Sequence, residues 1–442
     1  MKSLLTSIIV LLLICTGFAQ QPQWRELPDA PFESTSRFED CFFINDSTGW
    51  IIHIDGRVYK TSDGGQSWAM IYSREPNDVN FRCINFISEE TGFIGDIFRE
   101  FNADSSVLYK TTDSGFSWSV VELPDPVPDG LCGLFSLSES FIYGVGRYYG
   151  SPVFIKSEDG GLNWLSISLD TLARGLVDLY FISTETGFAA GSVNQSGIRG
   201  AIFKTNDGGE TWETAAVSSL TGISSWKISF PTSSTGYISF QGGGNDVLIF
   251  KTTNAGINWS EITYTLPDIF SAQGIGFADS LNGWISGFTL TDKTYQTTDG
   301  GLSWFEDDFG KIINRFRFLS DTLAYAVGQT VYKYSTMPVT NINTYVEPGL
   351  PDAYTLEQNY PNPFNPATKI SWQSPIGSHQ TIKVFNVLGR EVATLVDEFR
   401  DAGSYEVEFH PESGIRELAS GVYFYQLKSG GFVETKKMLL VR

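Results

Sequence analysis

The chain of 442 residues is short of histidine, cysteine and positive charge. It has three histidines and four cysteines, and its 30 Lys and Arg stand against 50 Asp and Glu, for a formal net charge of −20. His379 and His410 lie near the C-terminus, so no cluster of histidine ligands for a metal ion is expected. The negative balance repels polyanions and excludes nucleic acid as an expected partner. We expect no cofactor.

Long apolar runs are also missing after the first twenty residues. No later segment approaches the roughly 18 apolar residues of a membrane-spanning helix, so no membrane span is expected. The first segment has Lys2, an apolar run over 4–14, and small residues at Gly17 and Ala19. This pattern predicts a cleaved secretory signal peptide over residues 1–19. Cys15 follows Ile14, not the small residue that a lipoprotein signal needs, so no lipid anchor is expected.

Three cysteines remain after such cleavage, at Cys41, Cys83 and Cys132. An odd and sparse count does not support a disulfide framework. Cys83 and Cys132 each stand three residues before an aromatic landmark described below, which leaves a bridge between them open. The pattern favours small buried hydrophobic side chains.

A ten-residue phrase occurs six times, first from Tyr59 to Trp68, and its final tryptophans are 45 to 50 residues apart. A fixed period of this length indicates a repeat architecture. Alternating residues on both sides of each turn predict a strand, a tight turn and a strand, with glycine supplying positive φ. The acidic or amide residue and the tryptophan of the copies are Asp63, Trp68, Asp113, Trp118, Asp159, Trp164, Asp207, Trp212, Asn254, Trp259, Asp299 and Trp304.

These residues resemble the Asp-box, or BNR repeat, of β-propeller proteins. The resemblance implies that each box lies on a hairpin at the rim, away from the binding face. We therefore expect the box residues to form turns and not to act as catalysts or metal ligands. Copy five has Asn254 and Ala255 in place of Asp and Gly, which predicts a looser turn.

A second landmark, an aromatic residue before a short polar turn and a renewed apolar run, occurs seven times, around Phe43, Phe86, Phe135, Phe181, Phe230, Phe277 and Phe318. The seventh unit lacks a box, and the run from Gln23 to Leu27 resembles the strand that follows one. We therefore predict a seven-bladed β-propeller over residues 20–337, in which the N-terminal strand completes the last blade. The sequence of the blades is similar to the photosystem II assembly factor-like repeat. This resemblance implies the fold and does not imply a role in a photosystem.

The composition changes after residue 337. Pro338, Pro348 and Pro351 fall within fourteen residues and predict a semi-extended linker over 338–352. Short alternating runs then predict an immunoglobulin-like β-sandwich over 353–442. The predicted fold class is therefore all-β, a seven-bladed propeller followed by a sandwich.

This last segment resembles the type A C-terminal sorting domain of the type IX secretion system, found in Bacteroidetes and related phyla. The resemblance implies export through Sec and then the type IX translocon to the outer cell surface or the medium, with the translocon and its sorting peptidase as partners. It leaves open whether the domain is cleaved and whether the protein is released or anchored. The motif residues are Tyr360, Pro361, Asn362, Pro363, Phe364, Asn365, Pro366, Gly389, Gly421 and Tyr423.

No catalytic constellation emerges from the sequence. There is no Ser-His-Asp signature, and Phe81-Arg82-Cys83-Ile84 lacks the proline of the motif that opens a sialidase. A propeller binds ligands at the mouth of its channel. Counting back one or three residues from the landmarks gives the candidate ligand-binding residues Asp40, Asn85, Asp178, Lys227, Arg315 and Arg317.

Two functional hypotheses follow. The first is a secreted or cell-surface binding or scaffold protein that is not an enzyme, with an unidentified extracellular protein or glycan as ligand. The alternative is a polysaccharide-active glycoside hydrolase, or a carbohydrate-binding accessory protein of the Asp-box class, with carboxylates supplied by different blades.

Overall fold

The computed structural model describes residues 21–74, 79–97, 106–194, 197–242, 246–267, 269–289, 293–336, 354–375, 378–400, 403–411, 418–429 and 432–441. The predicted signal peptide (residues 1–19) and linker (338–352) lie outside these residues. Within the described ranges the chain forms strands and turns and no helix. The chain divides at residue 341 into two compact units.

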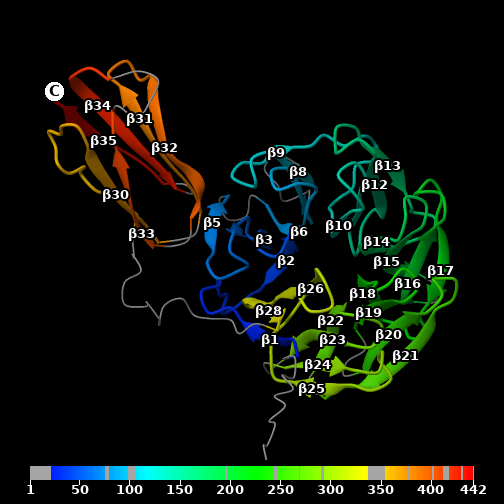
Figure 1. The fold of residues 1–442 in the computed structure, drawn as a ribbon. Coiled ribbons are helices and arrows are strands. Elements are labelled where there is room, and N and C mark those ends of the chain that lie inside the picture. The colour runs from blue at the N-terminus through cyan, green and yellow to red at the C-terminus, as the bar shows by residue number, and fades with distance from the viewer. Residues whose placement is uncertain are drawn as a thin grey trace, which may run out of the picture. The chain divides into compact units, whose positions relative to one another are not determined.

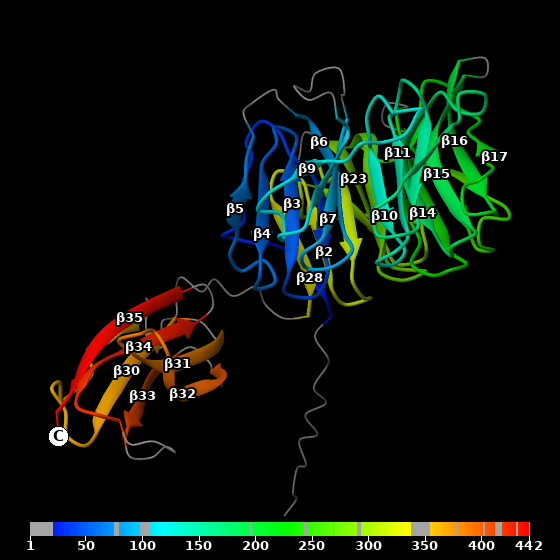
Figure 2. The same ribbon diagram turned by 90° about the horizontal axis from the view of Figure 1, so that it is seen from above.

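The first unit is a ring of seven four-stranded antiparallel sheets, the blades, around a central channel (Figure 1, Figure 2). In six blades the strands follow chain order from the centre outward. Blades one to three consist of β2 (Phe38–Phe43), β3 (Gly49–His53), β4 (Val58–Thr61) and β5 (Ala69–Tyr72); β6 (Phe81–Phe86), β7 (Gly92–Asp96), β8 (Leu108–Thr111) and β9 (Ser119–Val120); β10 (Gly133–Ser136), β11 (Ile142–Gly146), β12 (Val153–Ser157) and β13 (Leu165–Ser168).

Blades four to six repeat this order. They consist of β14 (Gly175–Phe181), β15 (Gly187–Asn194), β16 (Ile198–Thr205) and β17 (Glu213–Val217); β18 (Ser224–Ser229), β19 (Gly236–Gln241), β20 (Asp246–Thr252) and β21 (Ser260–Thr265); β22 (Ile269–Phe277), β23 (Gly283–Thr289), β24 (Thr294–Thr297) and β25 (Phe305–Asp307).

The seventh blade joins the two ends of the ring. Its inner strands are β26 (Arg315–Phe318), β27 (Ala324–Val327) and β28 (Val331–Ser335), and its outermost strand is β1 (Gln23–Glu26). β1 pairs antiparallel with β28, with Gln23 opposite Ser335 and Glu26 opposite Tyr332. The predicted closure by the N-terminal strand is confirmed. The pairing with β1 covers the edge of β28, which would otherwise be the exposed edge of the last blade.

The landmark phenylalanines pack between blades. The Phe86 ring stacks on Trp50 of the preceding blade, with centroids 3.6 Å apart and planes 9° apart. A Cβ atom on Gly92 would lie 2.6 Å from that ring, which is why glycine follows the landmark six residues later. Equivalent stacked pairs are Phe43 with Tyr325, Phe181 with Tyr143, and Phe277 with Tyr237.

The box turns fasten neighbouring blades to one another. Lys333 of blade seven donates a hydrogen bond of 2.8 Å to the carbonyl of Gly64 in the first box, and the Tyr325 hydroxyl donates one of 3.1 Å to the same oxygen. Lys251 of blade five reaches the carbonyl of Gly300 in blade six at 2.6 Å. The lysine and aromatic residue of the repeat therefore satisfy carbonyl groups that the next turn leaves free.

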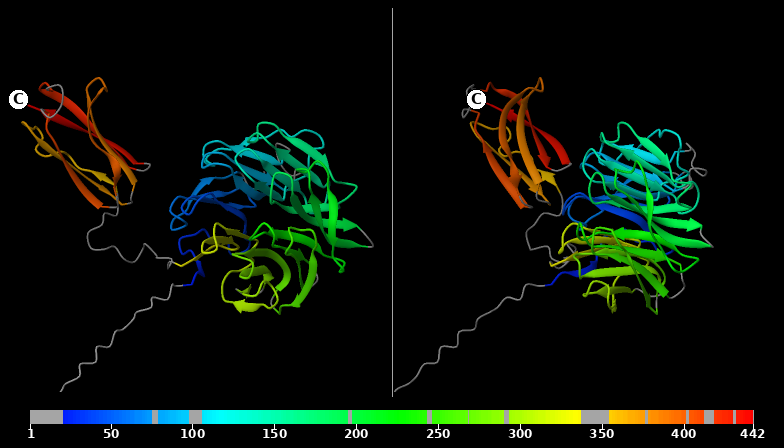
Figure 3. Two further views of the ribbon diagram at one scale, coloured as in Figure 1. Left: turned by 45° about the vertical axis from the view of Figure 1, so that its right-hand side comes forward. Right: turned by 90° about the vertical axis from the view of Figure 1, so that its right-hand side faces the viewer.

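The second unit is a β-sandwich (Figure 3). Alternate side chains along its strands are buried, as on Ile370 and Trp372, and form a core between the sheets. The all-β fold predicted for both units is confirmed. One sheet has the order β29 (Thr355–Leu356), β30 (Thr368–Ser374), β33 (Gly403–Phe409), and the other has the order β32 (Glu391–Arg400), β31 (Ser378–Asn386), β34 (Gly421–Ser429), β35 (Phe432–Leu440).

Candidate functional site

Bulges on the innermost strands concentrate polar side chains at the channel. The pairing with the second strand is irregular between Phe38 and Asp40 on β2, and similar irregularities occur on β6, β14, β18 and β22. A bulge leaves one residue unpaired and re-aims its side chain. Two layers of polar residues therefore meet at the channel instead of one.

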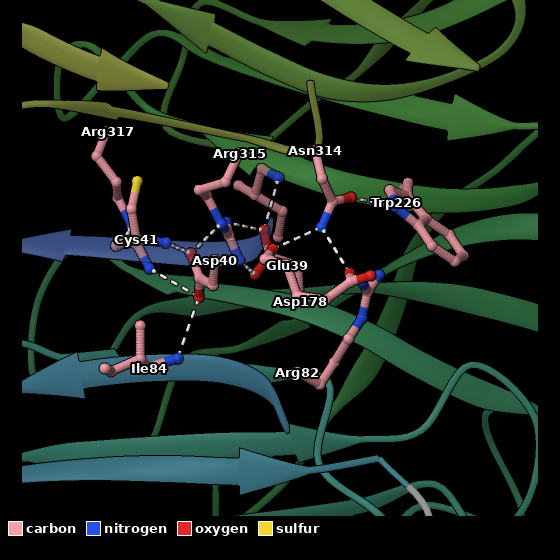
Figure 4. Close-up of polar contacts among 11 residues, drawn as sticks. Glu39, Asp40, Cys41, Arg82, Ile84, Asp178, Trp226, Asn314, Arg315 and Arg317 are labelled. Carbon is pink, nitrogen blue, oxygen red and sulfur yellow. Dashed lines mark hydrogen bonds and ion pairs between the residues drawn. The ribbon is translucent and has the colours of Figure 1, made fainter. Parts of the chain in front are cut away.

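The first layer is an ion network around Arg315. Its guanidinium donates two parallel bonds to Asp178, of 2.9 and 3.0 Å, and a third of 3.0 Å to Asp40 (Figure 4). Arg317 donates to the carbonyl of Cys41 at 3.0 Å and lies 3.5 Å from Asp40. Burial opposes ionisation of Asp178, but the charges of Arg315 and Lys227 and the hydrogen bonds from Arg315 and the Ile228 N–H together outweigh it and lower the pKa of Asp178 below its ordinary value. Two carboxylates and two guanidinium groups thus neutralise one another.

The second layer is built around Glu39 (Figure 4). Its carboxylate forms an ion pair with Arg82 and lies 3.6 Å from Arg37. Asn314 donates to the Glu39 carbonyl at 2.7 Å and accepts a hydrogen bond of 3.4 Å from the Trp226 indole. The Arg82 guanidinium also lies 5.6 Å from the centre of the Trp226 ring.

The second layer places two guanidinium groups beside one carboxylate. Arg37 and Arg82 both lie against Glu39, and burial lowers the pKa of each guanidinium to about 10. Both remain cationic at neutral pH. Two buried cations are therefore gathered at this point of the channel.

The upper mouth is the channel opening at which the innermost strands begin. It is a hollow of about 560 Å³, and no Asp or Glu is among its lining residues within the described ranges. Arg174, half-buried, adds a third guanidinium there. The charged and aromatic side chains of its lining include Arg37, Arg82, Tyr148, Tyr149, Arg174 and Trp226.

The lower mouth is the opening at which the innermost strands end. It is a hollow of about 440 Å³ whose wall includes several aromatic residues. Arg315 and Asp178 lie at its inner end. The aromatic and polar side chains of its lining include Phe135, Tyr180, Phe230, Arg317, Ser320 and Asp321.

Of the six candidate residues chosen from the sequence, the structure brings Asp40, Asp178, Arg315 and Arg317 into one network. Lys227 is buried, and its amino group has no hydrogen-bond partner among the described residues. Burial, and then the charge of Arg315, lower the pKa of Lys227 to about 7. Asn85 is also buried, and its Oδ1 atom has no partner in the described part of the chain.

The sequence reasoning missed the second layer. Glu39, Arg82 and Trp226 each stand four residues before a landmark, one position beyond the two that were counted. The position four residues before the landmark is polar or aromatic in several repeats, and this pattern could have indicated the second layer. Its side chains reach the channel only because of the bulges.

The three cysteines at Cys41, Cys83 and Cys132 are buried and free, so the structure contains no bridge between Cys83 and Cys132. The Cys83 thiol donates a weak bond of 3.7 Å to the carbonyl of Leu131. Burial raises the pKa of all three thiols. At neutral pH they are therefore protonated and lack the thiolate character of reactive cysteines.

The Asp-boxes lie on the hairpins between the third and fourth strands of six blades, and none of the box residues lines either mouth. Asp207 accepts the backbone N–H of Thr211 at 2.9 Å and its hydroxyl at 2.5 Å. Hydrogen bonds of this kind lower the pKa of Asp159, Asp207 and Asp299 to about 2.

The fifth box differs from the expectation of a looser turn. Asn254 Oδ1 accepts the N–H of Asn258 and the hydroxyl of Thr252, both at 3.0 Å. In the other copies one carboxylate oxygen accepts these two bonds, so the amide oxygen closes the turn in the same way. The second carboxylate oxygen of those copies also accepts a bond from the side chain of the residue before the tryptophan.

The sorting-motif residues lie mainly on turns of the sandwich. Phe364 is buried, and its N–H donates to the carbonyl of Leu439 beside the last strand. Tyr360 is exposed, Gly389 turns the β31–β32 hairpin at φ 74°, and the Tyr423 hydroxyl donates to the carbonyl of Ala419 at 2.9 Å. The proline-rich segment thus packs against the C-terminal strand.

Neither a metal centre nor a membrane-spanning helix is found in the part of the chain that the structure describes. No group of three or more His, Cys, Asp or Glu there is arranged to hold an ion. No helix there is long and apolar enough to cross a bilayer.

Comparison with known proteins finds matches to part of each unit. Residues 358–441 match the family described as a secretion system C-terminal sorting domain, and residues 18–140 match photosynthesis system II assembly factor YCF48. The photosystem II assembly lipoprotein Ycf48 of Synechococcus sp. (strain CC9902) is 32% identical over 208 residues, which are 47% of this chain and 44% of that protein. The chain therefore spans less than half the length of this relative.

Solved propellers share the fold. The structure described as YCF48 bound to D1 peptide has a TM-score of 0.52 at 19% identity and covers 72% of this chain and 97% of its own. YCF48 from Cyanidioschyzon merolae has a TM-score of 0.53 at 18% identity, with coverage of 71% and 98%. A GH74 xyloglucanase from Xanthomonas campestris has a TM-score of 0.53 at 12% identity, with coverage of 93% and 75%. Identities this low show the fold alone.

The matched C-terminal family supports export by the type IX secretion system to the cell surface or the extracellular space. The chain is a β-propeller with photosystem II assembly factor-like repeats, fused to a C-terminal sorting domain of that system.

Proposed function

We propose that the protein is a binding protein of the cell surface or extracellular space that holds an acidic peptide segment at the upper mouth of its propeller. The observation that carries this proposal is the gathering of arginine side chains there. Three guanidinium groups, of Arg37, Arg82 and Arg174, line a hollow that has no Asp or Glu among its lining residues in the described part of the chain. In a chain of net charge −20, such a local cluster of arginine favours an anionic ligand.

The shape and lining of the mouth suit a peptide end. Guanidinium groups recognise carboxylates with directional paired bonds, and Tyr148, Tyr149 and Trp226 add aromatic contact surface. The solved propeller described as bound to D1 peptide supports a peptide as the ligand class, since it shares this fold. The ligand of the present chain would be a segment of an extracellular protein with acidic side chains or a free C-terminal carboxylate.

Titration calorimetry tests this proposal. The full secreted protein is titrated with acidic hexapeptides that carry either a free C-terminal carboxylate or a C-terminal amide. Arg174→Gln is expected to weaken binding about tenfold, since one charged hydrogen bond is lost. Arg25→Gln on β1, outside both mouths, is the control and is expected to bind as the wild type does. Equal binding by Arg174→Gln and the wild type would refute the site.

The delivery route is part of the proposal. Residues 1–19 would direct the chain through Sec, and residues 353–442 would then be recognised by the type IX translocon and its sorting peptidase. Deletion of residues 351–442 is expected to leave the propeller in the periplasm, as shown by fractionation and immunoblotting. Undiminished protein in the medium would contradict the route.

The hydrolase alternative finds no support in the channel. Hydrolysis of a glycoside by paired carboxylates needs one acid that holds a proton and a second that attacks or activates water. Glu39, Asp40 and Asp178 are each held in ion pairs with arginine. A reducing-end assay on a polysaccharide panel separates the two functions, and turnover would overturn the binding proposal.

A further inference from the structure

The lower mouth has a continuous aromatic wall. Phe135, Tyr180 and Phe230 come from three consecutive blades, and their ring centres are 4.8 Å and 5.2 Å apart along the series. The planes of Tyr180 and Phe230 differ by 14°. Phe135 and Tyr180 are only partly buried. The hollow beside them, about 440 Å³, is within the range of about 300 to 1,000 Å³ that is usual for small-ligand sites.

Polar groups line the same hollow. The Arg317 side chain is 22% exposed and lines the hollow. Its Nε atom donates to the carbonyl of Cys41, and its Nη2 atom lies 3.5 Å from Asp40. Burial raises the pKa of Tyr180, and the charge of Arg317 opposes this rise. Ser320 and Asp321 are exposed at the rim. Donors and acceptors therefore both stand beside the aromatic wall.

The charge of this mouth differs from that of the upper one. Arg315 and Arg317 are matched by Asp40 and Asp178, and Asp321 adds one negative charge at the rim. The cations that line this hollow in the described part of the chain are Arg315 and Arg317, and both are already paired with carboxylates. A neutral ligand avoids the cost of bringing a charge into a site that is already balanced.

A neutral sugar ring has the chemistry that this surface would recognise. The C–H face of a pyranose is apolar and packs on an aromatic ring, while its hydroxyl groups both donate and accept hydrogen bonds. We propose that the lower mouth is a second binding site, which holds a neutral sugar ring of a glycan on Phe135 and Tyr180, with hydroxyl groups bonded to Arg317 and Asp321. This site is separate from the peptide site proposed above and does not depend on it.

Calorimetry with sugars tests the proposal on the full secreted protein. The probes are neutral hexasaccharides of glucan, xylan, galactan and mannan, and a hexasaccharide of uronic acid. At least one neutral probe is expected to bind. Tyr180→Leu, which removes the stacking ring, is expected to weaken that binding about tenfold. Asp321→Asn, an exposed change that keeps the fold, is expected to weaken it severalfold because the charged acceptor is lost.

The controls identify the site. Phe305→Leu removes an aromatic ring that is exposed on β25, outside both mouths, and is expected to bind sugar as the wild type does. Tyr180→Phe keeps the ring and separates stacking from the hydroxyl group. Binding of acidic peptide at the upper mouth should be unchanged in Tyr180→Leu. The proposal is overturned if no neutral probe binds, if the uronic acid probe binds more tightly, if Tyr180→Leu binds equally well, or if a peptide with an aromatic side chain displaces the sugar.

Discussion

Arg315 on β26 holds Asp178 on β14 through two parallel hydrogen bonds of 2.9 and 3.0 Å, which join the seventh blade to the fourth across the channel. Both side chains are buried, with relative exposures of 5% and 2%. The pair therefore closes the channel between its two mouths with charged groups in place of apolar ones.

Removal of one charge of the Arg315–Asp178 pair should lower the free energy of unfolding. Asp178→Asn removes the charge but keeps the shape, and it leaves Arg315 with Asp40 as its single carboxylate at close range. We expect a loss of about 3 to 5 kcal/mol in the free energy of unfolding, measured by urea titration of tryptophan fluorescence. The double variant Asp178→Leu, Arg315→Met should recover much of that loss. A single variant as stable as the wild type would contradict this account of the network.

Lys227 should make stability depend on pH. Burial lowers its pKa in the folded protein to about 7 from the ordinary value of 10.5, so the folded state binds fewer protons than the unfolded state between these values. The contribution of Lys227 to the free energy of unfolding is therefore lowest below pH 7 and rises as the pH increases toward 10.5. The charged neighbours that set this value are Arg315, Asp178, Arg82 and Asp40.

The comparison of Lys227→Met with the wild type isolates this effect. The variant should be more stable than the wild type at pH 6, and its advantage should shrink at pH 9. A pH of 9 is chosen because Arg37 and Arg82, with pKa values of about 10, remain protonated there. Urea unfolding at both pH values gives the two differences. An advantage that does not change with pH would show that Lys227 is already protonated to the same extent in both states.

Much of the fold could be predicted from the sequence because the repeat encodes local chemistry. The turn of each box is specified by residues within five positions, and the Phe–Gly landmark specifies the contact between blades, as Phe86 and Gly92 do. The channel was predicted in part, since Asp40, Asp178 and Arg315 hold equivalent positions. Glu39, Arg82 and Trp226 were missed because simple alternation assigns them away from the channel, and a bulge on each strand reverses that assignment.

Closure of the ring depends on Trp24. Its ring is stacked on Phe309, with centroids 4.9 Å apart and planes 7° apart, and also contacts Trp284 and Tyr334. Trp24→Ala should cost about 3 to 5 kcal/mol, the usual effect of truncating a large core aromatic residue. It should also make the first strand accessible to trypsin at Arg25. Unfolding and limited proteolysis with N-terminal sequencing measure both effects, and Trp24→Phe should retain most of the stability. A stable Trp24→Ala variant that resists trypsin would mean that β1 is not needed to close the ring.

Ala255 and Ser114 occupy the turn position that is glycine in the other four boxes, and both have positive φ, 55° and 64°. A residue with a Cβ atom is strained there by about 1 to 2 kcal/mol, which glycine avoids. Glycine also gives the unfolded chain more freedom, which offsets about half of the gain. Ala255→Gly should therefore stabilise the propeller by up to about 1 kcal/mol. Ser114 differs because its hydroxyl donates a hydrogen bond of 2.8 Å to the carbonyl of Glu89 in the same blade.

The matched variant Ser114→Gly relieves the same strain but loses this hydrogen bond, which is worth about 1 kcal/mol. Its net change should be close to zero, so the two substitutions are expected to differ although the backbone geometry is the same. Urea unfolding of both variants beside the wild type measures the difference. Equal stabilisation by both would mean that the Ser114 hydroxyl contributes nothing. Destabilisation by Ala255→Gly would mean that strain at positive φ is smaller than the entropy that glycine adds to the unfolded chain.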